Sequence, residues 1–253
     1  MASEEDLRLR PQVYLDERPA EYFTRFHEHA RTHEPDWVYW LVKILSDPYV
    51  RLAFRLKAYG LQKVPASGPV ILAPNHFSAM DHWFVGIRLW PRRVRFMAKS
   101  QLFRGRLLEY IMAHGGAFPV RRGQRDEEAI KTALTILERG GVIVIYPEGG
   151  RSRTGHLGSS ARPGIGRLAL ESGAPVVPVA VHGSERARNW RRLRFPDVAV
   201  RYGDALRFAV EPDPSRQRQQ EVADQIFAEV RELHRAATSQ RQLEGASTSA
   251  AMQ

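Results

Sequence analysis

The sequence contains no cysteine. This absence excludes a disulfide framework, a thiol nucleophile and any thiolate-ligated zinc or iron–sulfur site, and it favours a reducing, cytoplasmic compartment. Long apolar runs are also missing, because the longest one, Trp37 to Leu45, is interrupted by Lys43. A spanning helix needs about 18 to 20 apolar residues, so we expect no transmembrane segment. The charged start, Met1 to Arg10, lacks the apolar core of a secretory signal.

Acidic residues are too few to balance the basic ones. The 38 Lys and Arg residues exceed the 28 Asp and Glu residues, which gives a net charge of +10 and a pI near 10.3. Such an excess attracts polyanions, namely nucleic acid, an anionic bilayer or phosphorylated substrates. Of the basic residues 33 are Arg and 5 are Lys. Arginine suits bidentate phosphate recognition, although biased codon usage is the simpler explanation for most of them.

The hydrophobic pattern divides the chain into four parts. Residues 1–34 are polar and are predicted to form an irregular arm or short helices, and residues 35–60 an amphipathic helical pair. Residues 61–236 carry the alternating apolar segments of the main domain. Residues 237–253 are small and polar, as expected of a disordered tail. This organisation fits one large domain with an appended element.

The helical pair carries aromatic and basic side chains. Asp36 is a suitable N-cap for a helix from Trp37 to Leu45, and Asp47-Pro48 is predicted to start a second, basic helix. Three aromatic residues at the start of the pair are typical of an element lying in a bilayer interface: Trp37, Tyr39 and Trp40. A helical hairpin packed on the main domain is an equally good interpretation, and the sequence leaves both open.

Beyond residue 65, apolar segments alternate in type. Five of them are predicted to be short buried strands, at residues 69–73, 94–98, 117–120, 142–146 and 176–181. The clearest helical pattern between them runs from Asp126, a predicted N-cap, to Arg139. Strands that alternate with helices imply an α/β fold, with a mainly parallel sheet flanked by helices. Residues 198–202 and 205–208 are predicted to form an edge hairpin, and residues 214–236 a last helix.

A histidine and an aspartate follow the first predicted strand. His76 and Asp81 are five positions apart, in a loop that leads into a predicted helix from Asp81 to Trp90. A turn before the helix lets the two side chains meet, so that Asp81 accepts from one imidazole nitrogen and leaves the other as a general base. The pair alone is weak evidence, because His and Asp are often neighbours by chance and can simply cap a helix.

Two further clusters lie next to other strands, and strand ends are where open parallel sheets bind ligands. Residues 115–121 read Gly-Gly-Ala-Phe-Pro-Val-Arg, and residues 146–153 read Tyr-Pro-Glu-Gly-Gly-Arg-Ser-Arg. Glycine allows close backbone approach, and the guanidiniums suit a phosphate or a carboxylate. Taken alone, the second cluster would be interpreted as a solvated basic loop.

Four motifs therefore occur in order: Asn-His-x-x-x-x-Asp at 75–81, Gly-x-x-Phe-x-x-Arg at 115–121, Pro-Glu-Gly-x-Arg-Ser at 147–152 and Val-Pro-Val at 177–179. Together they resemble the motifs of the glycerolipid acyltransferases, above all 1-acyl-glycerol-3-phosphate acyltransferases and related lysophospholipid acyltransferases. The resemblance spans roughly residues 60 to 210. One position departs from it, since Gly150 stands where the family usually has Thr, and a hydroxyl donor is lost.

The resemblance implies a role for each matching residue. His76 would deprotonate the acceptor hydroxyl, and Asp81 would hold its tautomer and stabilise the imidazolium that forms. Lys99 would lie near the acceptor phosphate, and Val177 and Val179 would pack near the acyl site. The substrate-binding set that it implies comprises Asn75, Lys99, Gly115, Phe118, Arg121, Glu148, Gly149 and Arg151.

Other patterns in the sequence are weaker evidence of function. Without a cysteine or a Gly-x-Ser-x-Gly elbow, nothing nominates an acyl-enzyme, and direct attack of a His-activated hydroxyl on a thioester is the simpler mechanism. Gly164-Ile-Gly166 spells part of a dinucleotide fingerprint but follows a loop, so close helix packing is favoured. His82 lacks partners with metal-ligand spacing, and we expect no metal. The basic stretch 186–194 has only Trp190 as a stacking aromatic, which favours a solvated or lipid-facing loop over RNA binding.

The sequence thus predicts a peripheral acyltransferase on the cytoplasmic, inner face of the cell membrane. It would move a fatty acyl group from a thioester, acyl-CoA or acyl carrier protein, to a lysophospholipid, with no cofactor and no nucleic acid partner. The favoured acceptor is 1-acyl-glycerol-3-phosphate, which would give phosphatidic acid at an anionic membrane surface. The alternatives are an acyltransferase for another lysolipid or a glycolipid, and a non-catalytic basic protein of the same fold that binds membrane or RNA.

Overall fold

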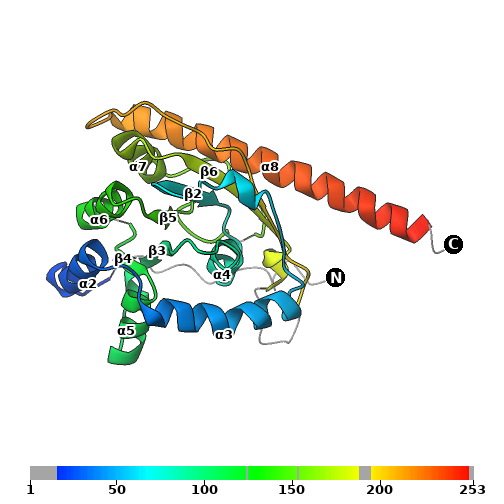
Figure 1. Ribbon diagram of the computed structural model, residues 1–253. Helices are drawn as coiled ribbons and strands as arrows, with labels where there is room; N and C mark the ends of the chain where they lie inside the picture. Colours follow the sequence, from blue (N-terminus) through cyan, green and yellow to red (C-terminus); the bar gives the residue numbers. More distant parts are fainter. Residues whose placement is uncertain (1–15, 124, 153, 188–194, 251–253) are drawn as a thin grey trace.

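The computed structural model describes residues 16–123, 125–152, 154–187 and 195–250 (Figure 1). The expectations for residues 1–10 and for Trp190 in the basic stretch therefore lie outside the described residues. None of the helices in these ranges has the length and apolarity needed to cross a bilayer.

A seven-stranded, mainly parallel sheet forms the centre of the protein, as the sequence predicts. Its spatial order is β1-β7-β6-β2-β5-β3-β4. The strands are β1 Lys57–Tyr59, β2 Val70–Pro74, β3 Val94–Lys99, β4 Ala117–Val120, β5 Val142–Val144, β6 Val176–His182 and β7 Ala199–Tyr202. Only the β6–β7 pairing is antiparallel. The central strands β2, β5 and β6 are buried along their whole length, which explains their continuous apolar sequence.

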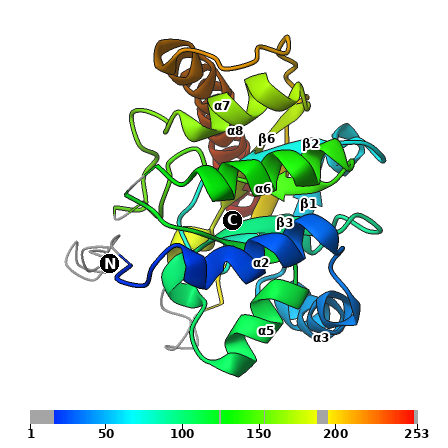
Figure 2. The ribbon, with the colours of Figure 1, turned by 90° about the vertical axis from the view of Figure 1, so that its left-hand side faces the viewer.

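Helices cover both faces of the sheet (Figures 1 and 2). The apolar cluster on one face is completed by α6 Glu127–Glu138, α7 Gly164–Ser172 and α8 Arg216–Ala250. The cluster on the other face is completed by α3 Trp37–Ala53 and α4 Asp81–Gly86. At the β4 edge, α2 Glu21–Thr32 and α5 Arg106–His114 enclose a third, smaller cluster. Short 3-10 turns include η1 Leu61–Lys63 and η2 Ser100–Leu102.

Within residues 35–60 the structure has one helix, α3, and the prediction of a helical pair is wrong. Asp36 caps α3 as expected, with its carboxylate accepting from the Val38 amide at 2.9 Å, but the helix continues through Pro48 to Ala53. Proline removes one backbone donor from the helix, and buried side chains hold both halves in place, Val38 near the start and Val50 near the end. The residues after α3 form β1.

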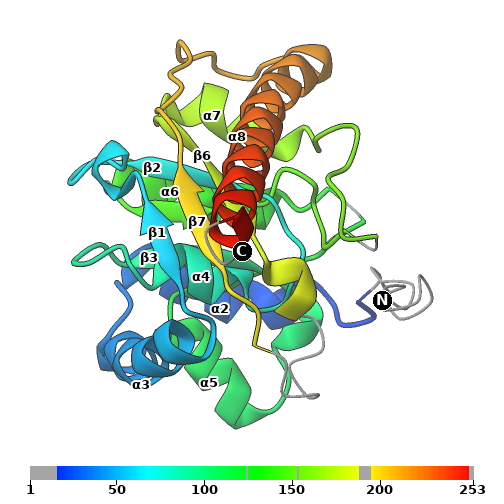
Figure 3. The same ribbon diagram turned by 90° about the vertical axis from the view of Figure 1, so that its right-hand side faces the viewer.

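The predicted edge hairpin is also wrong. β7 pairs antiparallel with β6 on one side and parallel with β1 on the other, as Figure 3 shows. Residues 205–208 contribute a single bridge, in which Leu206 exchanges backbone hydrogen bonds of 2.8 and 2.9 Å with Val176. The chain after β7 therefore returns along β6 without forming a strand of its own.

Both ends of the described chain depart from the predicted boundaries. Within residues 16–34 the structure has a short helix, α2, in agreement with the second of the two predicted alternatives, an irregular arm or short helices. It is not a separate arm, because it buries Phe23 and Phe26 against Phe103 and Ala117. At the other end α8 continues to Ala250, so most of the expected disordered tail is helical. The predicted buried stripe of this last helix is confirmed at its first three positions, Val222, Ile226 and Val230.

Close packing of α7 on α8 explains one glycine of the rejected dinucleotide fingerprint, Gly166, whereas Gly164 faces open space. A Cβ atom at Gly166 would lie 1.9 Å from the backbone oxygen of Gln219 in α8. Only glycine fits this approach, so the prediction of close helix packing is confirmed.

Candidate active site

The structure brings His76 and Asp81 together at the carboxyl end of β2. His76 Nδ1 lies 2.8 Å from Asp81 Oδ2, and both side chains are buried. The backbone amides of Phe77 and Ser78 each donate to the same carboxylate oxygen at 2.7 Å. This tight turn, with Asp81 as the first residue of α4, joins two side chains that a regular helix would separate.

The carboxylate fixes which nitrogen of His76 can act as a base. With Nδ1 donating to Asp81, the neutral imidazole keeps its lone pair on Nε2. Burial lowers the pKa of His76, and the positive charges of Arg122 and Arg151 lower it further, while Asp81 opposes this shift. His76 is therefore neutral at physiological pH and able to accept a proton.

An aromatic ring holds the imidazole from its other side. Tyr146 stacks on His76, with ring centroids 3.9 Å apart and an interplanar angle of 20°. The Tyr146 hydroxyl lies 3.4 Å from Nδ1 of His82, whose pKa falls to about 4 because of burial. His82, expected to be a bystander, thus lies in the second layer around His76 as a neutral ring. No separate role was predicted for Tyr146, although its position just after a strand is a usable signal.

Glu148 connects the loop of the third motif to that of the first by hydrogen bonds. Its Oε1 accepts from the His76 amide at 3.0 Å, and its Oε2 accepts from the Gly158 amide at 3.3 Å. The Ser152 amide in turn donates to the His76 carbonyl at 2.8 Å. Burial raises the pKa of Glu148. Glu148 therefore positions the loop around His76 through its backbone contacts, whereas the sequence predicted that it would bind the acceptor.

Gly149 makes the turn that this arrangement requires. Its φ of +69° lies in the left-handed region, and a Cβ atom there would come within 2.7 Å of the Arg162 side chain. Its amide closes the turn by donating to the Tyr146 carbonyl at 2.9 Å. The glycine thus shapes the loop that carries Arg151.

Two arginines, Arg122 and Arg151, act through their charge on both His76 and Lys99. Lys99 ends β3 at the carboxyl edge of the sheet, and its pKa is lowered by burial and by the charges of Arg122 and Arg151. We refer to Lys99, Arg122 and Arg151 as the basic cluster. Such a cluster suits a doubly charged phosphate better than a neutral headgroup.

Arg121, the arginine of the second motif, has a different partner. Its amide donates to Asp126 Oδ2 at 2.7 Å, and its Nε lies 3.7 Å from the same oxygen. Asp126 also caps α6 by accepting from the Ala129 amide, so Arg121 is tied to the start of that helix. Arg122, which the sequence analysis missed, is the residue of this Arg-Arg pair whose charge reaches His76.

The structure does not bring three other predicted substrate-binding residues to an open position in the site. Gly115 precedes β4 and so lies at the amino edge of the sheet, opposite His76. Phe118 is fully buried in the core. The Asn75 amide group is buried, donating to the Val181 carbonyl at 3.0 Å and accepting from its amide at 2.7 Å, so it fixes the loop to β6. Val177 and Val179 of the fourth motif are buried strand residues, as expected.

Among the described residues, no three histidine or carboxylate side chains converge as ligands for a metal ion.

An open parallel sheet with a His–Asp pair at a strand end and a basic cluster beside it defines a class of group-transfer enzyme. Residues 55–182, about half of the chain, match the Acyltransferase family, and the protein belongs to it.

Two curated relatives show which acyltransferases the chain is similar to. The chain is 28% identical over 128 residues to a 1-acyl-sn-glycerol-3-phosphate acyltransferase of Bacillus subtilis, a match that covers 51% of this chain and 63% of the relative. It is 30% identical over 164 residues to a lyso-ornithine lipid O-acyltransferase of Pseudomonas aeruginosa, covering 63% of this chain and 55% of the relative. The chain thus spans less than two thirds of the length of each.

A solved structure shares the fold. The crystal structure of the 1-acyl-sn-glycerophosphate acyltransferase PlsC from Thermotoga maritima aligns with a TM-score of 0.57, covering 84% of this chain and 88% of that chain. The two sequences are 19% identical, so this likeness concerns the fold.

Proposed function

We propose that the protein transfers a fatty acyl group from a thioester to the free hydroxyl of a lysophospholipid, with 1-acyl-glycerol-3-phosphate as acceptor and phosphatidic acid as product. The observation that carries this proposal is the buried His76–Asp81 pair, with 2.8 Å between Nδ1 and Oδ2, beside the basic cluster. The printed activity of the Bacillus subtilis relative supports the choice of acceptor.

The reaction needs one base and no covalent enzyme intermediate. His76 Nε2 takes the proton of the acceptor hydroxyl as its oxygen attacks the thioester carbonyl carbon. The tetrahedral intermediate then expels the thiolate, which receives the proton from the imidazolium, and an ester replaces the thioester. Asp81 stabilises the imidazolium between these two steps. Coenzyme A or acyl carrier protein serves as the thiol carrier of the donor, so no further cofactor takes part.

The basic cluster supplies the contacts for the acceptor phosphate. We expect Arg151→Ala and Arg122→Ala each to lower kcat/KM for 1-acyl-glycerol-3-phosphate by roughly 10- to 150-fold, the loss of a charge-assisted bond of about 1.5 to 3 kcal/mol. Steady-state assays at varied acceptor and fixed donor measure this change. Arg125→Ala is the matched control, because Arg125 is exposed and paired with Glu127. An effect confined to the KM of the thioester would move these arginines to the donor site.

The basic cluster also sets the pH at which His76 works. Burial and the two arginines lower the pKa of His76 below its usual 6.5, so wild-type kcat/KM should fall only at pH values below 6.5, where the imidazole gains a proton. Removing the charge of Arg151 should raise that pKa and move the acid limb to higher pH. A pH–rate profile of both proteins checks the direction, and a limb that stays in place or moves to lower pH contradicts it.

We propose that the protein docks on the anionic, cytoplasmic surface of the cell membrane, and the outer face of α3 supports docking on a bilayer. Five exposed apolar side chains follow one stripe along the helix: Trp37, Leu41, Ile44, Leu45 and Leu52. Arg51 is the exposed basic residue of the same helix. Leu52 is 79% and Trp37 is 61% exposed. By contrast Tyr39 is buried, and its hydroxyl accepts from the Val94 amide at 3.1 Å. α3 is therefore both packed on the domain and apolar toward the outside.

Ile44→Ser with Leu52→Ser is expected to weaken binding to anionic vesicles about 10-fold or more, because two side chains lose favourable transfer into the interface. Co-sedimentation with vesicles measures the change, and raising the salt concentration should weaken wild-type binding as well. Tyr39→Phe is the control, since it removes a buried hydroxyl and should lower the melting temperature without weakening vesicle binding. Unchanged binding of the double variant would place docking elsewhere.

The experiment that tests the proposed function is thiol release by the purified protein with a panel of acceptors. 1-Acyl-glycerol-3-phosphate should give the highest kcat/KM, because an acceptor without a phosphate offers no doubly charged group for the basic cluster to bind. Higher activity on lyso-ornithine lipid or on a glycolipid would leave the acyltransferase chemistry in place and change the acceptor. Absence of thiol release with every acceptor, together with binding to vesicles or RNA, would identify a non-catalytic protein.

A further inference from the structure

In α5 the apolar side chains face the solvent and an acidic side chain is buried. Its single fully buried side chain is Glu109, whereas four large apolar side chains are exposed: Leu107, Leu108, Tyr110 and Ile111. Leu107 is 74% exposed. Leu102, in the turn before the helix, is 45% exposed. A soluble surface rarely gathers this much apolar area in one place without a partner.

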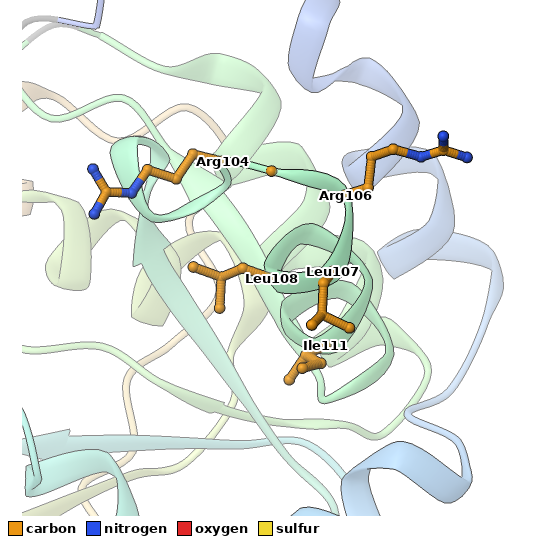
Figure 4. A pocket seen from close by; sticks show the side chains of 6 residues that line it. Arg104, Arg106, Leu107, Leu108 and Ile111 are labelled. Atoms are coloured by element: carbon orange, nitrogen blue, oxygen red, sulfur yellow. The ribbon is translucent and has the colours of Figure 1, made fainter.

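A shallow groove runs along this helix. It encloses about 420 Å³ and is lined by Arg104, Gly105, Arg106, Leu107, Leu108 and Ile111. Figure 4 shows the three apolar side chains gathered together, while the guanidiniums of Arg104 and Arg106 extend away from them in opposite directions. On a membrane surface, this arrangement would allow the apolar side chains to enter the lipid while the two guanidiniums stay among the headgroups.

α5 lies next to the start of α3 (Figures 1 and 2). The two helices lie side by side beneath the sheet in all three overall views (Figures 1, 2 and 3). The Asp36 amide at the start of α3 donates to the His114 carbonyl at the end of α5 at 3.3 Å, and the Asp36 carboxylate contacts the His114 ring. The end of α5 is therefore fixed to the start of α3, and a membrane that held α3 would lie near α5.

We infer that α5 is a second membrane-inserting element, whose apolar side chains enter an anionic bilayer while Arg104 and Arg106 contact lipid phosphates. This inference rests on the proposed membrane function and extends it beyond α3. Charge identifies the occupant: Glu109 is the only acidic residue from 100 to 115, and it is buried and bonded to Tyr22 and Arg25. A second copy using the same face would set its arginines against these arginines.

Insertion of α5 into a bilayer would also position the active site close to the lipid headgroups. The chain passes from Lys99, at the end of β3, through η2 to Arg104 and the start of α5. Phe103 anchors this short connection, since it is fully buried and its ring lies 4.9 Å from that of Phe26. Because the connection is short and packed, a bilayer that holds α5 holds Lys99 close to the headgroup plane, where the phosphate of a membrane-bound acceptor lies.

The test replaces Leu107, Leu108 and Ile111 together by Ser and measures binding to vesicles of equal parts phosphatidylcholine and phosphatidylglycerol. We expect a loss of affinity on the order of 10-fold or more. Val210→Ser is the matched control, because Val210 is 62% exposed but lies outside α3 and α5. Vesicle binding by this variant should equal that of the wild type. Circular dichroism reports whether the triple variant is folded.

A second variant keeps the test decisive if the triple variant does not fold. Leu107→Trp places a reporter at the most exposed position of α5, and its fluorescence should be quenched by lipids brominated in the acyl chain, over the level that the native tryptophans give. Absence of added quenching, while Ile44→Ser with Leu52→Ser still weakens binding, would overturn the inference and leave α3 docking intact. Self-association of the wild type that the triple substitution abolishes, with no change in vesicle binding, would assign the surface to a second copy and also overturn it.

Discussion

His76→Ala is expected to lower kcat by about 10²- to 10⁴-fold or more while leaving the fold intact. The imidazole of His76 is held neutral, oriented by the Asp81 carboxylate and stacked on the Tyr146 ring, which fits it for the role of general base. Its side chain contributes little to the core, since its polar contact is to Asp81. Thiol release under saturating substrate measures the loss.

His82→Ala is the matched control for this substitution. Its ring centroid lies 6.2 Å from that of His76, it is also kept neutral by burial, and it contacts the Tyr146 hydroxyl without reaching Asp81. We expect a much smaller loss of kcat for His82→Ala. Near-normal turnover of a folded His76→Ala protein would refute the assignment of the base.

Asp81→Asn is expected to lower kcat by about 10²- to 10⁴-fold, for a reason that the local geometry makes specific. The amides of Phe77 and Ser78 both point at Oδ2, so the substituted side chain should keep its oxygen there and still accept from Nδ1. The tautomer of His76 is then retained, and the lost quantity is the negative charge that stabilises the imidazolium. The substitution therefore isolates the electrostatic role of Asp81.

The pH profile distinguishes this role from a structural one. Asp81 raises the pKa of His76 against the effect of burial, so its neutralisation should lower that pKa and move the acid limb of kcat/KM to lower pH. Asp126→Asn is the control, because Asp126 is another buried helix-capping aspartate and should change the melting temperature more than the rate. A reduced rate with an unmoved acid limb would make Asp81 a structural residue only.

The parts of the fold that are buried on both sides could be predicted from the sequence. β2, β5 and β6 are continuous apolar runs because both faces of a central parallel strand are covered. β1 could not be predicted, since its three residues, Lys-Ala-Tyr, carry no pattern and depend on pairing with β7. The continuity of α3 through Pro48 was missed for a similar reason: tertiary packing at both ends outweighs the one lost hydrogen bond.

The candidate site shows the same division. The His76–Asp81 pair was predictable because both residues lie in one short loop, where local geometry decides their contact. The choice between Arg121 and Arg122 was not, because two adjacent arginines after a strand point to different sides, and only the capping of α6 by Asp126 shows which side each one takes. Gly115 and Phe118 share a motif with Arg121, yet one precedes β4 and the other is in the core, so motif membership did not mean contact with substrate.

The central claim is direct transfer from the thioester to a hydroxyl activated by His76. Rapid-mixing measurement of thiol release, with and without 1-acyl-glycerol-3-phosphate in vesicles, tests it most directly. The account predicts that thiol appears only when both acceptor and His76 are present, and in equal amount to the phosphatidic acid formed. A burst of thiol equal to the enzyme concentration in the absence of acceptor would demonstrate an acyl-enzyme and contradict it.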